Sequence, residues 1–431
     1  MAERTLIVGG LVIDPARRLE AVRDVLIEDG EIRAVEAGLS KKSGLKDAAV
    51  VDARGRWVIP GLVDMHVHLR EPGREDDETI ATGSAAAARG GVTTILAMAN
   101  THPPTDTPSQ LAFLRAKAAR DAAVNVLFAG AVTVGLKGER LTEFARLHAA
   151  GAAALSDDGR PVMNAGLLRR ALEYARDLGL LLIDHCEDLS LSGGGCAHEG
   201  AAALRKGLQG SPWAAETVQV VRDLALVELT GARLHFAHLS AAASVAAVRR
   251  AKKQGLPVSA EACPHHFALT DEMIPDFDAD WKMNPPLRSK EDRAALVAGL
   301  ADGTIDAIAT DHAPHGRAPK SAGFDAAPFG AIGLETSLAA ALTALYHTKA
   351  LTRRQIVERM SAAPAALLGL KAKGTLAPGA DADVVVADPD ALWTPEPPFA
   401  SKSRNTPFAG RRLKGRVLRT FVGGREIVHA L

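Results

Sequence analysis

Cysteine and long apolar runs are both scarce in this 431-residue sequence. Its three cysteines, Cys186, Cys196 and Cys263, form an odd and sparse set, which is typical of a reducing compartment. No apolar run approaches the ~20 residues that a membrane-spanning helix requires. The start of the chain lacks the basic and then apolar segments of a signal peptide. We therefore predict a soluble cytoplasmic protein with no membrane partner.

An excess of charge of either sign is also absent. Lys+Arg and Asp+Glu both number 51, so the formal net charge is zero. This balance argues against a nucleic acid or an anionic membrane held by bulk charge. Hydrophobic residues make up 47% of the chain, which is enough for a sizeable core. The length fits one large domain with an appendage, or two to three small domains.

The two ends of the chain differ from its middle in the secondary structure that their sequence predicts. Residues 5 to about 57 alternate short β-like runs with turns, and the chain from about Gly374 onward does the same. Two β-rich ends around a different middle predict one small β-sandwich built from both termini. We therefore divide the chain at residues 1–57, 58–370 and 371–431, with the first and last parts forming the sandwich.

The middle of the chain alternates strand and helix patterns. Strands are predicted at residues 62–68, 93–99, 125–132, 152–157, 180–185, 233–238, 257–262 and 305–310. Helices are predicted at residues 109–122, 164–178, 217–229, 243–253 and 290–300. Eight strands separated by helices over about 300 residues are the count of an α/β protein of the (β/α)8 TIM barrel class. Periodicity alone also allows an open, doubly wound sheet.

The stretch Pro60–Arg70 is the centre of this pattern. Polar residues interrupt its apolar run at every second position, so Asp64, His66 and His68 share one face of a strand. Two imidazoles on one face can both reach a single metal at ~2.0 Å. By itself, however, the short His-x-His pair favours two structural histidines at the end of a sheet, and the rest of the chain has to decide.

The predicted carboxyl ends of the strands carry further polar residues. They are His66 and His68, Asn100, Asp157 and Asp158, His185, His238, and Asp311. The active sites of barrels lie at this end, so four histidines and two carboxylates could form one cluster. Such a cluster could hold two divalent metals, and nitrogen and oxygen ligands favour zinc. Zinc would activate water and polarise a carbonyl, while a free carboxylate moves the proton, which is the chemistry of reversible amide or imide hydrolysis.

Four residues are placed to contact a substrate. Arg70 lies two residues beyond His68, so its guanidinium can bind a carboxylate from the same face. Asn100, Asn284 and His315 lie near predicted strand ends or in the loops that follow. A surface salt bridge for Arg70 and a turn for Asn284 are the competing interpretations. The Gly-, Ala- and Pro-rich segment 316–330 is predicted to be a lid over the barrel, with plain disorder as the alternative.

Together these residues resemble the dihydroorotase family of the cyclic amidohydrolase superfamily, over nearly the whole chain. The matching segments are Pro60–Arg70, Met98–Pro108, Ser156–Gly159, Asp184–Asp188, His235–Ser240, Pro264–Leu269, Asn284–Arg293 and Asp306–His315. The resemblance implies reversible cyclisation of N-carbamoyl-L-aspartate to L-dihydroorotate in pyrimidine biosynthesis. It also implies one or two zinc ions, with two expected, a homodimer, and aspartate transcarbamoylase as a possible partner.

The resemblance assigns roles by position. It implies that His66, His68 and Asp311 bind the first metal and that His185 and His238 bind the second. Asp158 matches the bridging carboxylate, and Asp311 also matches the catalytic acid and base. The remaining matches are Arg70, Asn100 and His315 at the substrate carboxylate and Asn284 at the pyrimidine ring. Cys263 departs from the pattern, because a threonine commonly stands there.

Two other readings compete with this one. Hydantoinases, dihydropyrimidinases and allantoinases bridge their metals with a carboxylated lysine on the fourth strand, but no lysine occurs between Gly138 and Arg205. Inactive homologues that scaffold aspartate transcarbamoylase typically lose metal ligands, and this chain keeps them. The family pattern favours Asp158 as the bridging carboxylate, although spacing alone cannot choose between Asp157 and Asp158, since adjacent strand residues face opposite sides.

Overall fold

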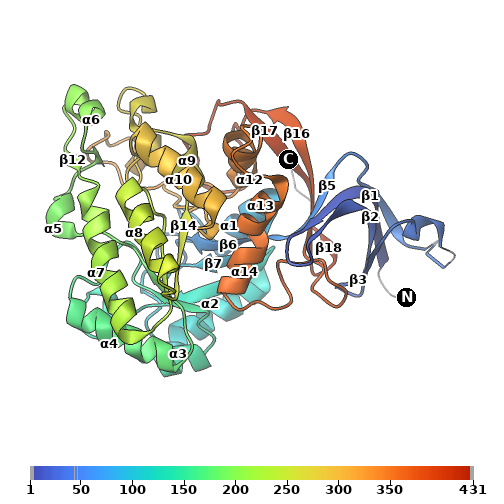
Figure 1. Ribbon diagram of the computed structural model, residues 1–431, viewed down its shortest axis with the longest axis horizontal. Coiled ribbons are helices and arrows are strands. Elements are labelled where there is room, and N and C mark those ends of the chain that lie inside the picture. The colour runs from blue at the N-terminus through green and yellow to red at the C-terminus, as the bar shows by residue number, and fades with distance from the viewer. Residues whose placement is uncertain (1–3, 43, 46, 428–431) are drawn as a thin grey trace.

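The structure is a computed structural model that describes residues 4–42, 44–45 and 47–427, and it contains a β/α barrel beside a smaller β-sandwich (Figure 1). The barrel is built by the middle of the chain, and both chain ends run into the sandwich. The predicted fold class is therefore confirmed.

Eight parallel strands form the barrel sheet in the order β15-β14-β13-β10-β9-β8-β7-β6. Their bounds are β6 (Leu62–Val67), β7 (Val92–Ala97), β8 (Asn125–Gly130), β9 (Ala154–Ser156), β10 (Leu182–Asp184), β13 (Leu234–Phe236), β14 (Val258–Ala262) and β15 (Ala307–Ile308). The sheet closes where Val67 pairs with His312 and the His68 amide donates to the His312 carbonyl at 2.8 Å. All eight predicted strands occur, with ends that differ by one or two residues.

Helices follow the strands and cover the outside of the sheet (Figure 1). The main ones are α1 (Ile80–Arg89), α2 (Pro108–Asp121), α3 (Phe144–Ala149), α4 (Ala165–Asp177), α7 (Ala214–Thr230), α8 (Ala242–Lys253), α10 (Lys290–Asp302) and α12 (Ser337–Ala341). Local sequence fixes several of their starts, because Thr79 and Ser289 form capping boxes and Thr107 caps α2 just before a proline. The five predicted helices all occur.

Shorter elements lie mainly in the loops. They are α5 (Leu189–Ser192), β11 (Ala197–His198), α6 (Ala201–Lys206), β12 (Gly210–Ser211), α9 (Pro264–Ala268), α11 (Arg317–Lys320), α13 (Arg353–Val357) and α14 (Ala363–Leu367). Five-residue π-helical segments also occur at Leu342–Tyr346 and Glu358–Ala362. Short 3-10 turns lie at Leu39–Lys41, Val134–Leu136, Asp271–Met273 and Ala279–Trp281.

The barrel strands contribute to two separate apolar clusters. On β7, Ile95 and Ala97 pack with the helices, whereas Leu96 packs with residues of other strands such as Met65 and Ile183. This alternation follows from the two-residue period of a strand. One cluster therefore lies between sheet and helices, and the other fills the inside of the barrel, as in other barrels of this class.

The sandwich is one hydrogen-bonded sheet with the order β18-β17-β16-β5-β1-β2-β3, and β4 pairs with β1. The strands are β1 (Arg4–Asp14), β2 (Leu19–Glu28), β3 (Glu31–Glu36), β4 (Ala49–Asp52), β5 (Trp57–Pro60), β16 (Val384–Trp393), β17 (Leu413–Val422) and β18 (Arg425–Glu426). Ile7, Val25, Val58, Val384 and Phe421 share one buried cluster, so residues from both chain ends build a common core. β5 ends at Pro60 and β6 begins at Leu62, so the chain passes directly from the sandwich to the barrel. The residues at which we divide the domains stay a prediction.

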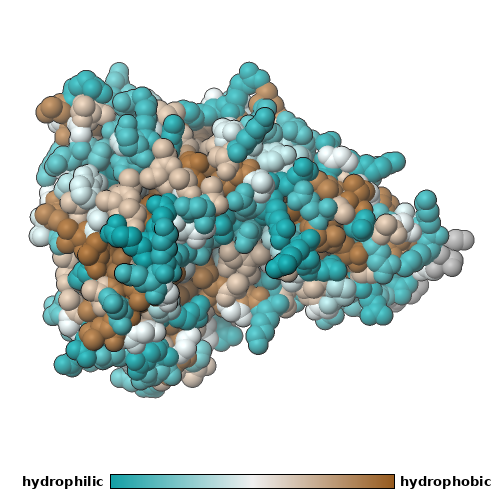
Figure 2. Space-filling view, in the orientation of Figure 1, coloured by the Kyte–Doolittle hydropathy of each residue, from teal (hydrophilic) through white to brown (hydrophobic). Residues whose placement is uncertain are grey.

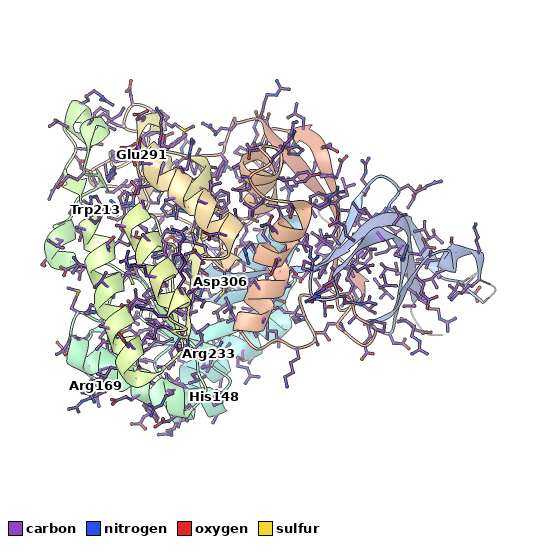
Figure 3. The ribbon with its side chains drawn as sticks, viewed as in Figure 1. His148, Arg169, Trp213, Arg233, Glu291 and Asp306 are labelled. Carbon is purple, nitrogen blue, oxygen red and sulfur yellow. The ribbon has the colours of Figure 1, made fainter. Side chains whose placement is uncertain are left out.

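The surface mixes polar and apolar groups (Figure 2). Charged side chains such as Arg169 and Glu291 are exposed on the helical layer, beside apolar ones such as Trp213, which is 48% exposed at the start of α7 (Figure 3). Within the described residues, no helix combines the length and apolar character needed to cross a bilayer.

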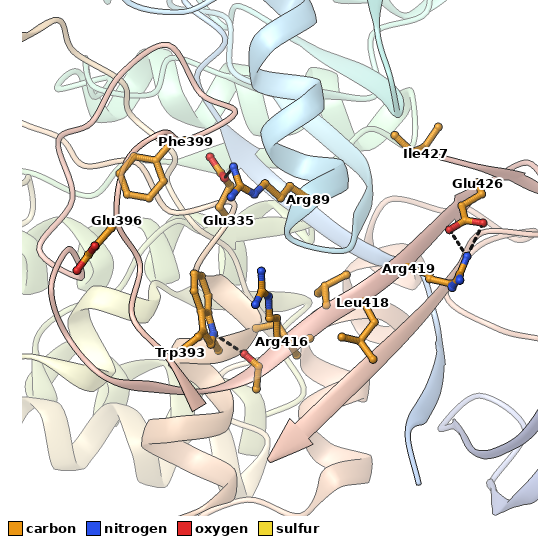
Figure 4. A pocket seen from close by; sticks show the side chains of 14 residues that line it. Arg89, Glu335, Trp393, Glu396, Phe399, Arg416, Leu418, Arg419, Glu426 and Ile427 are labelled. Carbon is orange, nitrogen blue, oxygen red and sulfur yellow. Dashed lines mark hydrogen bonds and ion pairs between the residues drawn. The ribbon is translucent and has the colours of Figure 1, made fainter. Parts of the chain in front are cut away.

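A cleft of about 590 Å³ runs along β17, between the sandwich and the barrel (Figure 4). Two ion pairs line it, since Arg419 lies 2.6 Å from Glu426 and Arg89 lies 3.2 Å from Glu335. The indole nitrogen of Trp393 donates to the Gly415 carbonyl at 2.7 Å. The polar groups of this cleft are therefore largely satisfied by one another.

Candidate metal centre

Six predicted ligands meet at the carboxyl ends of five barrel strands. His66 and His68 come from the end of β6, and the others lie within three residues after β9, β10, β13 and β15: Asp158, His185, His238 and Asp311. All six are at most 6% exposed. Parallel strands of a barrel end at the same rim, which is why residues far apart in sequence converge here.

Asp158 lies at the centre of this cluster. Its Oδ1 is 3.2 Å from His66 Nε2, 3.5 Å from His238 Nε2 and 3.6 Å from His185 Nδ1. Its Oδ2 is 3.4 Å from His68 Nε2. Burial opposes ionisation of this carboxyl, but the charge of His66 and the nearness of the other imidazoles hold the pKa of Asp158 well below its usual range. One carboxylate thus faces four imidazoles.

Asp311 lies on the other side of the two β6 histidines. Its Oδ1 is 3.0 Å from His68 Nε2 and 3.7 Å from His66 Nε2. Ligand atoms of His66, His68 and Asp311 all lie within 4.8 Å of one another, and so do those of His66, Asp158 and His238. The cluster therefore offers two overlapping sets of three donors.

The donor atoms fit a divalent cation. His66 Nε2 and Asp158 Oδ1 are buried and have no hydrogen-bond partner. A buried polar atom without a partner costs free energy, which a bound cation would offset. Imidazole nitrogens with carboxylate oxygens are a common ligand set of zinc. The residues present therefore suit the predicted metal.

Glu261, on β14, was not predicted from the sequence. Its side chain is fully buried and accepts hydrogen bonds from His66 Nδ1 at 2.7 Å and His235 Nε2 at 3.1 Å. Burial opposes its ionisation, but the charge of His66 and these hydrogen bonds lower the pKa of Glu261 to about 2. Such a carboxylate fixes the orientation and tautomer of a ligand histidine. A glutamate in the otherwise uncharged strand Val258–Ala262 was the available signal.

Asp157 and Asp158 point to different places. Asp157 Oδ1 accepts from the backbone amides of Val132 at 2.7 Å and Thr133 at 3.1 Å, and the carboxylate also bonds to the Thr133 hydroxyl. Asp157 therefore ties β9 to the loop after β8. Asp64 has a similar role, because it accepts from the amides of His66 at 3.1 Å and Thr310 at 3.2 Å. Neither carboxylate belongs to the histidine cluster.

A cavity of about 350 Å³ opens above the cluster, and all four predicted substrate residues line it: Arg70, Asn100, Asn284 and His315. Asn100 Oδ1 accepts from His68 Nδ1 at 2.9 Å, so this side chain also orients the ring of a predicted ligand. Asn284 Nδ2 donates to Glu187 at 2.8 Å, and the same Glu187 oxygen is 3.0 Å from His185 Nε2. Glu187, which sequence reasoning missed, thus links the cavity wall to the cluster.

His315 is held between a carbonyl and two arginines. Its Nε2 lies 2.7 Å from the Phe329 carbonyl and its Nδ1 lies 2.9 Å from Arg74, a cavity residue that sequence reasoning also missed. The ring therefore donates from Nε2 and accepts at Nδ1. Burial and the charges of Arg70 and Arg74 lower the pKa of His315 to about 2, so the ring is neutral at neutral pH.

The segment 316–330 packs against the cavity. Pro328, Phe329 and Gly330 line it, while Phe324 is 3% exposed. The buried Lys320 donates to the carbonyls of Ala279 at 2.7 Å and Pro328 at 3.0 Å. The segment therefore has defined anchors in this conformation, and its movement as a lid stays a prediction.

Comparisons with known proteins agree with this arrangement. The Dihydro-orotase-like family model matches residues 55–244, and the Amidohydrolase family model matches residues 235–428. The dihydroorotase of Anaeromyxobacter dehalogenans strain 2CP-C is 54% identical, with 100% of this chain and 98% of the relative covered. The dihydroorotase of Pelotomaculum thermopropionicum is 51% identical, with 99% and 98% covered.

Solved structures share the whole fold at lower identity. The L-hydantoinase (dihydropyrimidinase) from Arthrobacter aurescens is 27% identical, with a TM-score of 0.87 and coverage of 99% of this chain and 96% of that chain. The dihydropyrimidinase from Brevibacillus agri is 26% identical, with a TM-score of 0.86 and coverage of 99% and 95%. Barrel and sandwich are therefore a shared architecture.

Proposed function

The chain belongs to the dihydroorotase family of cyclic amidohydrolases and is a hydrolase acting on cyclic amides, and we propose that the cavity above Asp158 interconverts N-carbamoyl-L-aspartate and L-dihydroorotate. The observation that carries this proposal is the buried carboxylate of Asp158 facing four imidazoles. In hydrolysis, the ring C–N bond breaks, the oxygen of water joins the carbonyl carbon, and a proton goes to the ring nitrogen. Ring closure reverses these changes and releases water.

We propose that the six clustered side chains hold zinc, with two ions expected. His66, His68 and Asp311 would share one ion, His185 and His238 the other, and Asp158 both. When bound, zinc activates water and polarises the amide carbonyl. The chain's own contribution is to fix the imidazoles: Glu261 and Asn100 bond to the outer nitrogens of His66 and His68, and Glu187 bonds to that of His185.

Asp311 is proposed to carry the proton. The carboxylate sits at the edge of the cluster and lines the cavity, so it can face both the attacking water and the leaving nitrogen. Burial opposes its ionisation, but the hydrogen bond from His68 and the charge of His66 hold the pKa of Asp311 below its usual range. The group is therefore ionised at neutral pH and starts hydrolysis as a base. It then returns the proton to the ring nitrogen as an acid.

Arg70 is proposed to bind the carboxylate of the substrate. Its Nε donates to the Pro314 carbonyl at 3.1 Å, which fixes the guanidinium against the cavity wall. The backbone of Arg70 has φ of 60°, a left-handed conformation that is costly for a residue with a side chain. Asn100 and His315 are proposed to contact the same carboxylate, and Asn284 the pyrimidine ring. Arg74 adds positive charge next to His315.

A hydantoinase-type reaction is the second candidate, because solved hydantoinases share the fold. The residues at the site favour the first candidate, the interconversion of N-carbamoyl-L-aspartate and L-dihydroorotate. Asp158, just after β9, faces the four imidazoles, and no lysine lies between Gly138 and Arg205 to take the bridging role that a carboxylated lysine has in hydantoinases. Arginines at the cavity also suit a substrate that carries a carboxylate, which an unsubstituted hydantoin lacks.

One experiment tests both candidates. Purified protein is assayed for ring closure of N-carbamoyl-L-aspartate and for opening of hydantoin and dihydrouracil, with metal analysis on the same sample. We expect turnover of the first substrate, little of the others, and one to two zinc ions per chain. Faster opening of hydantoin than closure of N-carbamoyl-L-aspartate would favour the second candidate instead.

A homodimer, a cytoplasmic location and binding to aspartate transcarbamoylase are further proposals. They rest on the family alone. Light scattering of the purified protein measures its mass, and we expect twice the chain mass of 45.1 kDa. Adding the organism's own aspartate transcarbamoylase to the same measurement tests the complex. A mass that stays that of one chain would refute the dimer.

A further inference from the structure

A second group of metal-binding side chains lies beyond the end of β14. Cys263 directly follows that strand, and His265 and His266 belong to the short helix α9. Cys263 is fully buried, and each histidine is 3% exposed. The sulfur and one nitrogen from each ring lie within 4.8 Å of one another. None of the three belongs to the cluster around Asp158.

The two rings of this group present unpaired nitrogens. His265 Nε2 and His266 Nδ1 are buried without a hydrogen-bond partner. His266 Nε2 lies 2.9 Å from the Pro285 carbonyl, so it carries the proton, and Nδ1 keeps its lone pair. Burial lowers the pKa of His265 to about 4 and that of His266 further, so both rings are neutral at neutral pH. Neutral imidazoles with free lone pairs are good metal ligands.

A third buried group, Asp184, Cys186 and Asp223, provides a contrast. There the Cys186 thiol donates to Asp184 at 3.4 Å, and Arg222 donates to Asp223 at 2.7 Å. The Cys186 thiol and the Asp223 carboxylate thus have hydrogen-bond partners within the protein. The Cys263 group instead leaves two ring nitrogens without a partner in the protein, and a bound ion is one partner that would satisfy such atoms.

We propose that Cys263, His265 and His266 form a binding site for a thiophilic divalent cation, such as Cd²⁺, Co²⁺ or Zn²⁺. Zinc takes sulfur at ~2.3 Å and nitrogen at ~2.0 Å, so tetrahedral ligand atoms are roughly 3.5 Å apart. Small side-chain rotations would bring the three atoms from their present spacing to this one. The thiol releases its proton to solvent as the cation binds, which leaves one sulfur–metal bond and two nitrogen–metal bonds.

The charges around the group favour a cation. Asp311 and Glu261 both act on Cys263, and together with burial they raise the pKa of its thiol well above its usual value. The same negative charges attract a metal. Cations bound at the Asp158 cluster would weaken this attraction. We therefore expect the Cys263 site to bind its cation after the Asp158 cluster is occupied.

Filling the site would reach the catalytic cavity. His266 bonds to the Pro285 carbonyl, next to Asn284 on the cavity wall. Glu261, on β14 two residues before Cys263, bonds to His66. A cation that pulls α9 and the end of β14 would disturb both contacts, and we expect it to inhibit. The binding itself does not depend on the proposed function, because it is measured without substrate.

Cadmium titration of the zinc-loaded protein tests this site. Thiolate bound to Cd²⁺ absorbs in the ultraviolet by charge transfer, whereas the Asp158 cluster contains no sulfur ligand. We expect one further equivalent of cadmium with this absorption in the wild type. The band should persist in Cys196→Ser and Cys186→Ser, which remove the other two thiols, and disappear in Cys263→Ser. Zinc content and melting temperature of each variant report whether it is folded.

The histidines are tested separately. His266→Ala keeps the sulfur, so the band should remain while the affinity for Cd²⁺ falls at least tenfold. An unchanged affinity would mean that a lone thiol binds the metal, and the proposal would fail. It would also fail if the wild type shows no band, if Cys263→Ser keeps it, or if Cys186→Ser alone removes it. None of these outcomes bears on the proposed function, which the ring-closure assay tests separately.

Discussion

The barrel mouth and the cleft along β17 are two cavities with charged walls, and they differ in how those charges are paired. The β17 cleft is the more spacious, at about 590 Å³ against about 350 Å³. Two of its arginines, Arg89 and Arg419, face glutamates within the protein. At the barrel mouth, His66 Nε2 and Asp158 Oδ1 are buried without partners, and none of the described residues lining the β17 cleft has such an atom. In this molecule, unsatisfied buried polar atoms rather than a larger volume mark the cavity where the predicted ligands lie.

The two cavities also differ in backbone conformation. At the barrel mouth, Arg70, His238 and Asp311 have positive φ, at 60°, 30° and 46°. Such conformations cost free energy and persist where the surrounding packing enforces them. Among the described residues that line the β17 cleft, positive φ occurs only at Gly415, which carries no Cβ. Strain thus coincides with the polar cluster rather than with the roomier cavity.

Removing the central carboxylate should have the largest effect. We expect Asp158→Ala to lose metal and to lower kcat/KM roughly a thousandfold or more, because no other carboxylate among the described residues faces all four imidazoles. Asp157→Ala is the matched control, since Asp157 bonds to the loop after β8 instead. It should keep its metal and lose stability. Metal analysis and assays with and without bicarbonate measure both variants. Normal metal content in Asp158→Ala, or a rate that depends on bicarbonate, would contradict the bridging role.

Removing the proton carrier should have the next largest effect. We expect Asp311→Asn to keep most of its metal, because the histidines remain, but to lose about 10²- to 10⁴-fold in kcat. Steady-state kinetics and metal analysis on one preparation separate these two outcomes. Turnover within about threefold of the wild type would refute the assignment of Asp311 as acid and base.

Changing the proposed carboxylate ligand should have a moderate effect. Arg70→Lys keeps the charge but loses the planar fork, so we expect KM for N-carbamoyl-L-aspartate to rise about 10- to 100-fold. The comparison is an uncharged cyclic imide, whose KM should change little. Equal weakening of both substrates would show that Arg70 has a structural role.

The paired charges of the β17 cleft should matter least. Arg419 and Glu426 are a partly exposed ion pair, with side chains 46% and 35% exposed. We expect Arg419→Ala to lower the free energy of unfolding by ~1 kcal/mol at most. Its kcat/KM should equal that of the wild type. Denaturant unfolding and the ring-closure assay measure this variant. A large loss of activity would show that the β17 cleft, and not only the barrel mouth, takes part in the reaction.

Much of the site was predictable because the spacing of residues along each strand fixes which side chains share a face. A strand has a period of two, so the spacing of His66 and His68 already placed both on one face. Parallel strands in a barrel end at one rim, so polar residues at successive strand ends had to converge. Five of the six predicted ligands and all four predicted substrate residues line one cavity, and the sixth, His66, lies next to Asp158 and Asp311.

The sequence by itself determined which elements form and which residues stand at the strand ends, because periodicity and turn residues act over a few positions. Only the tertiary structure decided between Asp157 and Asp158, since the amides of Val132 and Thr133 take up one carboxylate and leave the other to the histidines. It also paired Glu261 with His66 across 195 positions of sequence. Such contacts depend on how distant strands align when the barrel closes, and no local pattern contains that information.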